Sequence, residues 1–307
     1  MELQKQILST LAYFDLFDYP LTQTEIYRFL QEQCGYNRCG DELQFLVNQG
    51  LVYKYDSFYS LRKDFTLIIR RRDGNARAKQ LLRTAEKVGR LLYHFPFVRG
   101  IAVSGSLSKN CASEGADIDL FLITAKDRLW IARTLLHILK KISFLFNRQG
   151  YLCMNYFVDE SGLCIEEKNI YTATEIVTLI PLQGIDAFRE FYLQNKWTTS
   201  YLPNHSLKVS YFKRKNDSLL KRLLEFLLNH TAGNLVNEWL MRITKKRWNR
   251  KSKNGRRNSR GILMGMNASI HCAKPDPANF QIWLLHQYRQ KVSGIFNHAA
   301  DHLKAVY

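Results

Sequence analysis

The stretch that decides the fold reads IAVSGSLSKNCASEGADIDLFLIT and occupies residues 101–124. It begins and ends in apolar runs whose residues are typical of buried strands. Between these runs stand Gly105-Ser106, a polar spacer, and then Asp117 and Asp119 at the head of the second strand. Successive side chains of a strand point to opposite faces, so we expect the two aspartates to face the same side of a sheet.

Two carboxylates on one face repel each other unless a cation lies between them. Mg²⁺ or Mn²⁺ is the simplest such cation, because hard divalent ions take oxygen ligands. A Gly-Ser turn beside them offers backbone N–H groups that approach a phosphate closely. The stretch therefore predicts a metal at Asp117 and Asp119 and a phosphate site at Gly105 and Ser106, against the alternative of solvated aspartates at a strand start. Lys109 is close enough in sequence to bind the phosphate, although a solvated role is equally open.

The arrangement resembles the nucleotidyltransferase superfamily that includes DNA polymerase beta, whose signature is an apolar strand, Gly-Ser, a spacer and Asp-x-Asp. The resemblance covers residues 98–182. It implies a small mixed sheet with helices on one face, a nucleoside triphosphate (NTP) as substrate, and transfer of its nucleoside monophosphate to an unidentified acceptor. It also implies that Asp117 and Asp119 are catalytic metal ligands and that Gly105 and Ser106 hold the triphosphate.

Active members of that superfamily add a third carboxylate on a neighbouring strand, where it activates the acceptor. The candidate strand, YLCMNYFVDESG, places Asn155 in its interior, and an amide cannot act as a base. Asp159 shares the parity of Asn155, so we assign it as the third catalytic residue. Glu166, which follows an expected hairpin strand at 163–165, is the next candidate. The lack of an obvious acid keeps open a catalytically weak regulator that senses nucleotides or binds nucleic acid and uses the winged helix.

The chain as a whole predicts an α+β protein in three parts. Residues 1–66 resemble a winged helix-turn-helix module, with three short helices and then a hairpin about Asp56-Ser57. Residues 67–185 form the expected nucleotidyltransferase core, and residues 186–307 a basic, helical C-terminal region.

The third helix of the N-terminal module is expected at 41–49, where the sequence has no Lys or Arg. A helix that reads DNA normally presents basic groups to phosphates and base edges. We therefore favour a structural or protein-docking role for this module over sequence-specific DNA binding.

The remaining helices follow from apolar periodicity. A Gly-, Asn- and Pro-rich stretch at 255–277 is expected to be a loop. The expected helices are a long basic one at 68–94, then 127–147, 172–179, 218–243 (which Gly233 divides) and 279–306.

Charge suggests a polyanionic partner. The net charge is +18, and residues 242–260 contain many Lys and Arg but no acid. Such a block either binds RNA or another polyanion, or is merely solvated. Trp248 within it is a candidate for stacking on a base.

Composition also suggests where the protein resides. No apolar run has the length of a membrane span, and the first residues lack a signal-peptide pattern. The six cysteines are scattered, with no second pair to match Cys34 and Cys39 at zinc-site spacing. The histidines, including His271, have no metal-site spacing and are expected to be structural. These features predict a cytoplasmic protein with reduced thiols and no membrane partner.

Overall fold

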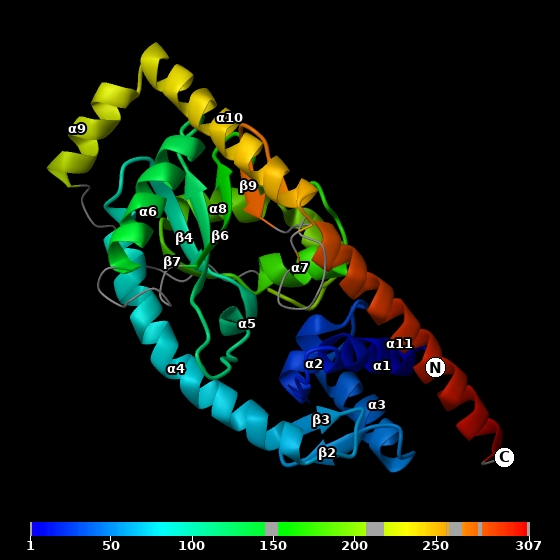
Figure 1. Ribbon diagram of the computed structural model, residues 1–307. Coiled ribbons are helices and arrows are strands. Elements are labelled where there is room, and N and C mark those ends of the chain that lie inside the picture. Colours follow the sequence, from blue (N-terminus) through cyan, green and yellow to red (C-terminus); the bar gives the residue numbers. More distant parts are fainter. Residues whose placement is uncertain are drawn as a thin grey trace.

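The structure is a computed structural model that describes residues 2–144, 153–206, 218–255, 257, 266–275 and 278–305. Its centre is a mixed sheet with the strand order β7-β4-β5-β6-β9-β8 (Figure 1). Strand β5 pairs antiparallel with β4 and parallel with β6. The strands are β4 (Val98–Val103), β5 (Asp119–Thr124), β6 (Cys153–Asp159), β7 (Ile180–Gln183), β8 (Met266–Ala268) and β9 (Cys272–Pro275). The predicted α+β class is confirmed.

Helices cover both faces of this sheet, which corrects the expectation of helices on one face. Leu120, Leu122 and Phe157 face one helical layer, whereas Phe121 and Ile123 face the other. The first layer consists of α4 (Thr66–Tyr93), α6 (Leu129–Phe144) and α10 (Thr231–Lys253), and the second of α7 (Ile170–Val177) and α8 (Ile185–Gln194). The alternation along β5 places Asp119 on the face covered by α7 and α8.

Three strands of the central sheet, β7, β8 and β9, were not predicted. Residues 163–165 form no strand; instead β9 pairs with β6, with Phe157 opposite Ala273. The stretch 255–277, predicted as a loop, therefore contains the hairpin of β8 and β9. Pro181, expected to end a helix, lies in β7, and this edge position tolerates a residue without a backbone N–H.

The N-terminal elements match the predicted order of helices and hairpin. The capping box is present: the Thr22 hydroxyl accepts from the Glu25 N–H, and the Glu25 carboxylate accepts from the Thr22 N–H. The third helix begins earlier than expected and therefore includes Arg38. The helices are α1 (Glu2–Asp15), α2 (Gln23–Phe29) and α3 (Tyr36–Asn48), and the strands β1 (Leu21–Thr22), β2 (Tyr53–Tyr55) and β3 (Phe58–Ser60) form a sheet in the order β1-β3-β2.

The C-terminal helices pack on both ends of the molecule (Figure 1). Helix α11 (Ala278–Ala305) contacts α1 and adds Leu284 to the core of the N-terminal module. Helix α9 (Leu219–Leu228) is separated from α10 at Asn229 and His230, a few residues before the expected break at Gly233. The connecting elements are α5 (Gly105–Ser108) and the 3-10 helix η2 (Lys196–Ser200).

The first part of the basic block, residues 242–253, forms the C-terminal half of α10, which ends at Lys253. Trp248 is buried there against Trp130, with Arg133 over its ring, so it is not available to stack on a base. This result corrects the interpretation of Trp248 as a stacking residue. Within the described residues, none of the helices has the combined length and hydrophobicity that crossing a membrane requires.

Arg71 joins the N-terminal module to the sheet domain. Its side chain is 2% exposed and extends from α4. It donates to the Glu25 carboxylate at 2.5 Å and to the Asn110 carbonyl at 3.2 Å, and its guanidinium lies 3.7 Å from the centre of the Tyr19 ring. Because Asn110 follows the Gly-Ser turn, one buried cation fixes that turn against the module.

We predict that Arg71→Ala lowers the free energy of unfolding by about 3 kcal/mol, since it leaves the Glu25 charge and the Asn110 carbonyl without their partner. Arg70→Ala is the matched control, because Arg70 is 61% exposed and lies 3.6 Å from Asp18. Its expected effect is within about 0.5 kcal/mol. Urea denaturation measures both, and equal losses in the two variants would contradict a central role for Arg71.

Candidate functional site

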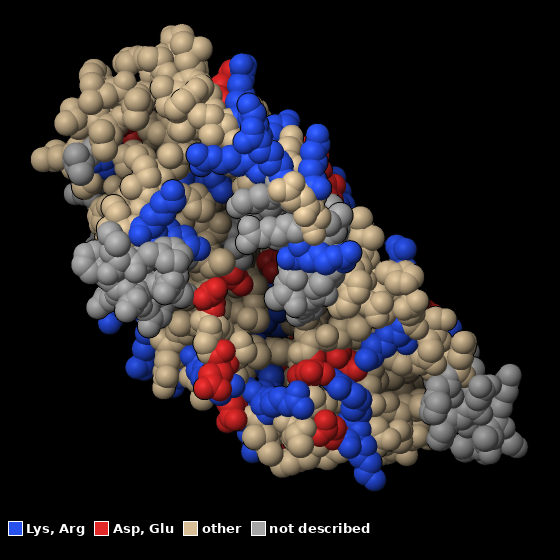
Figure 2. Space-filling model, in the orientation of Figure 1, with Lys and Arg blue, Asp and Glu red and all other residues tan. Residues whose placement is uncertain are grey.

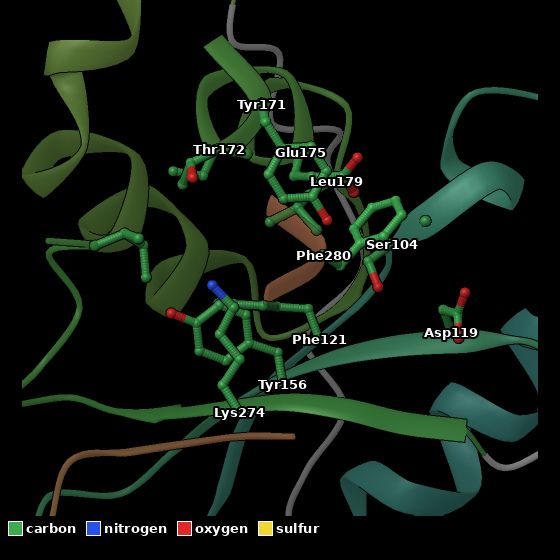
Figure 3. A pocket seen from close by; sticks show the side chains of 13 residues that line it. Ser104, Asp119, Phe121, Tyr156, Tyr171, Thr172, Glu175, Leu179, Lys274 and Phe280 are labelled. Atoms are coloured by element: carbon green, nitrogen blue, oxygen red, sulfur yellow. The ribbon is translucent and has the colours of Figure 1, made fainter. Parts of the chain in front are cut away.

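A cavity of about 400 Å³ lies between the sheet and α7. Ser104, Gly105 and Asp119 line one end, and Lys274 of β9 lines it from the strand side. Figure 3 shows Tyr171, Thr172 and Glu175 on the α7 side, facing Tyr156 and Lys274 across the space. The volume is in the range of small-molecule and cofactor sites.

Gly105 and Asp119 meet at the cavity end. The Ser104 N–H donates to the Asp119 carbonyl at 2.9 Å, which brings the end of β4 against the start of β5. Gly105 has φ +66°, and a Cβ at this position would lie 2.5 Å from Asp119 Oδ2. Only glycine fits both the left-handed backbone and the close carboxylate. The structure thus brings together two of the residues that the sequence singled out.

The charges of Asp117 and Asp119 both raise the pKa of the Cys153 thiol. Cys153 lies directly beside Asp119 in the parallel register of β5 and β6. Burial, the largest cause, raises the pKa of Cys153 to about 11 together with the charges of Asp119 and Asp117 and a hydrogen bond to Asp119. The pairing places Asp119 beside Cys153, whereas Asp117 precedes β5 and the shared face of the two aspartates stays a prediction. Asp119 is half-buried, whereas Asp117 is exposed and does not line the cavity.

Ser106 and Lys109, the other predicted phosphate ligands, do not line the cavity. Ser106 is exposed and does not line the cavity. Lys109 donates to Glu175 Oε1 at 2.8 Å and to the Gly105 carbonyl at 3.0 Å. Its ammonium therefore ties the Gly-Ser turn to α7. Glu175, which lines the cavity, was missed because α7 carries no motif linking it to the signature.

Asp159 is not near this site. It pairs with Thr124 at the far end of β5, whereas Asp119 is at the near end. Five residues of strand separate these positions by roughly 16 Å. The assignment of Asp159 as the third carboxylate is therefore contradicted by its position. Glu166 is exposed and does not line the cavity, and the side chain of Asn155 lies outside the described residues.

The prediction for Asp159 was wrong because β6 contains a bulge. The register between β5 and β6 shifts after the pair Leu120–Met154, so that Phe121 lies opposite Tyr156. The shift accommodates Asn155 as an extra residue and reverses the parity of the later residues of the strand. Phe157 consequently faces away from the cavity, into the other hydrophobic core.

Asp159 instead belongs to a buried cluster at the opposite edge. It is fully buried and accepts hydrogen bonds from the backbone N–H groups of Asp127, Ser161 and Gly162. His271 Nδ1 lies 2.9 Å from Asp159 Oδ2 and 3.8 Å from Asp127 Oδ1. The ligand atoms of Asp127, Asp159 and His271 lie within 4.8 Å of one another, a spacing that can hold a metal. Asp159 already accepts hydrogen bonds from several backbone N–H groups. These bonds indicate a structural role, in which its carboxylate holds together the loops that contain Asp127, Ser161 and His271.

No protein-family model, curated protein or solved structure matches the chain.

We predict that Gly105→Ala destabilises the protein more than Gly115→Ala. Both glycines have positive φ, +66° and +68°, so both variants incur backbone strain of about 1 kcal/mol. Only at Gly105 does the new methyl group collide with a carboxylate, because Gly115 has no neighbour within 4 Å. The additional loss is expected to be about 1–3 kcal/mol.

Thermal and urea denaturation of the two variants give the comparison. Equal losses would show that Asp119 moves away freely, and that the close contact does not constrain the site.

Proposed function

We propose that this chain is a metal-dependent nucleotidyltransferase, which moves a nucleoside monophosphate from an NTP to an acceptor. The observation that carries the proposal is the contact of Gly105 with Asp119 at the end of a nucleotide-sized cavity. A carboxylate and a backbone without a side chain at one cavity end suit a metal-bound phosphate chain. The resemblance of residues 98–182 to polymerase beta-like nucleotidyltransferases supports the same proposal.

Asp117 and Asp119 would hold Mg²⁺ or Mn²⁺. The donor set fits, since both side chains offer carboxylate oxygens and both charges act on the Cys153 thiol. Asp119 Oδ2 lies against the Gly105 backbone, so a metal held by this carboxylate would lie next to the Gly-Ser turn. When bound, the ion would neutralise charge on the phosphate oxygens.

The remaining polar residues position the substrate. Lys109 holds the Gly105 carbonyl and so fixes the direction of the turn. Among the described residues that line the cavity, Glu175 is the carboxylate other than Asp119. We assign to Glu175 the role first given to Asp159, which is to accept the proton of the acceptor. Its ion pair with Lys109 holds the carboxylate beside the Gly105 turn.

The double variant Asp117→Asn with Asp119→Asn should weaken Mg²⁺-dependent NTP binding at least tenfold, about 1.4 kcal/mol, because it removes both proposed metal ligands. It should also abolish labelling of an acceptor in a cell lysate supplied with labelled NTP. Glu114→Gln is the matched control, since Glu114 is an exposed acid of the same spacer. Calorimetric titration measures binding. Undiminished Mg²⁺-dependent affinity in the double variant would refute the site.

A nucleotide-sensing regulator is the second candidate. It is favoured by Cys153, which stands beside Asp119 on β6 where an active enzyme needs an acid. It is also favoured by the Tyr19 hydroxyl, which donates to the Lys109 carbonyl and so links the N-terminal module to the Gly-Ser turn. Tight NTP binding without any labelled product would select this candidate over the transferase.

We also infer a cytoplasmic location. All six cysteines are free thiols, as the reducing cytoplasm permits.

The hypothesis that the chain binds RNA or another polyanion concerns the basic residues of α10. Figure 2 shows Lys and Arg side chains gathered where Figure 1 places this helix. The exposed basic residues there include Arg242, Lys245, Lys246, Arg247 and Arg250. We propose that they bind the phosphates of an RNA acceptor, since each neutralised phosphate releases counterions.

Changing Lys245, Lys246, Arg247 and Arg250 to Ala should therefore flatten the slope of log affinity against log salt by about 3 units for single-stranded RNA. The matched control removes the same charge from α4, where Lys79, Arg83, Lys87 and Arg90 are exposed. Fluorescence anisotropy at several salt concentrations measures the slopes. Equal slopes in the two quadruple variants would show that α10 has no special role.

A further inference from the structure

Lys274 is a largely buried cation inside the cavity. Its side chain is 14% exposed, and its nearest carboxylate, Glu167 Oε1, is 3.8 Å away from Nζ. That distance is beyond a hydrogen bond, and none of the described side chains accepts one from this ammonium. The ion pair with Glu167 does not use all the donors of this ammonium, and Lys274 lines the cavity. The cavity therefore suits a ligand that brings an acceptor to Lys274.

The floor of the cavity leads from Asp119 to Lys274. Asp119 and Phe121 lie on the same face of β5, and Phe121 lies opposite Tyr156 on β6. Lys274 follows on β9, with Nζ 5.1 Å from the centre of the Tyr156 ring. The carboxylate end and the ammonium end of the cavity are thus joined by two aromatic side chains.

Aromatic side chains also bound the opposite side. Tyr171 of α7 and Phe280 of α11 line the cavity, with ring centres 5.9 Å apart at 73°. Phe121 and Tyr156 contact each other edge to face at 5.2 Å. Aromatic walls favour a flat ligand, because stacking on a ring tolerates any base with a π face.

We propose that Lys274 selects the base of the NTP, and that the chain binds GTP or UTP in preference to ATP or CTP. This inference rests on the proposed function, which places the phosphates at Gly105 and Asp119. The edge of the base farthest from the ribose then reaches Lys274. Guanine and uracil present a carbonyl oxygen at that edge, whereas adenine and cytosine present an amino group, which is itself a donor. An ammonium bonds the carbonyl and is mismatched with the amino group.

The test is calorimetric binding of GTP, UTP, ATP and CTP, each with Mg²⁺, to the full chain. Inosine triphosphate is the matched probe for ATP, because a carbonyl replaces the amino group of adenine. We expect GTP or UTP, and inosine triphosphate, to bind about tenfold more tightly than ATP, the effect of one hydrogen bond to a charged group. Equal or tighter binding of ATP would overturn the inference without any variant.

Lys274→Met supplies the second measurement. It keeps the length of the side chain without the donors, so the ratio of the inosine triphosphate and ATP affinities should fall to about one. Lys79→Met on the exposed face of α4 is the control and should keep the ratio of the unaltered chain. A ratio that survives Lys274→Met would assign selectivity to another group and overturn the proposal.

The outcomes also separate this inference from the proposed function. Mg²⁺-dependent binding that requires Asp117 and Asp119 but shows no base preference would overturn the role of Lys274 alone. No binding of any NTP would overturn both.

Discussion

The contact between Gly105 and Asp119 is the constraint on which the site depends. Antiparallel pairing of β4 with β5 brings the last residues of one strand against the first residue of the other. Asp119 Oδ2 occupies the space that a Cβ at Gly105 would need, so the turn and the carboxylate fit together only with glycine there. Lys109 then bonds the Gly105 carbonyl and Glu175, which extends the same arrangement to α7.

The segment after this contact is held by α4 and by the N-terminal module. Arg71 binds the Asn110 carbonyl, and the Tyr19 hydroxyl binds the Lys109 carbonyl. Arg71 is itself paired with Glu25 of α2. Because these partners belong to α4 and to the N-terminal module, the position of the Gly-Ser turn depends on how that module is docked. The cavity likewise needs Lys274 and Phe280 from the C-terminal region.

The sequence predicted the features that depend on local spacing. The apolar run after the aspartates located β5, apolar periodicity located α4 and α11, and Thr22 with Glu25 marked the start of α2. The predictions were wrong where a single extra residue changes the alternation of a strand, or where the contacting residues are far apart in the sequence. The bulge at Asn155 reversed the parity on which the assignment of Asp159 rested. The short strands β7, β8 and β9 gave no periodic signal, so Lys274 and the pair of Asp159 with His271 were found only in the fold.

The most direct test of the central claim is the pKa of the Cys153 thiol with and without Mg²⁺, followed through the pH dependence of its alkylation. The nearby carboxylates disfavour the thiolate and help to hold this pKa near 11. A cation bound by Asp117 and Asp119 offsets their charge, so the account predicts that Mg²⁺ lowers the pKa and speeds alkylation at a given alkaline pH. The double Asn variant should start from a lower pKa and ignore Mg²⁺. A Cys153 pKa that does not respond to Mg²⁺ in the unaltered chain would contradict a metal site at these aspartates.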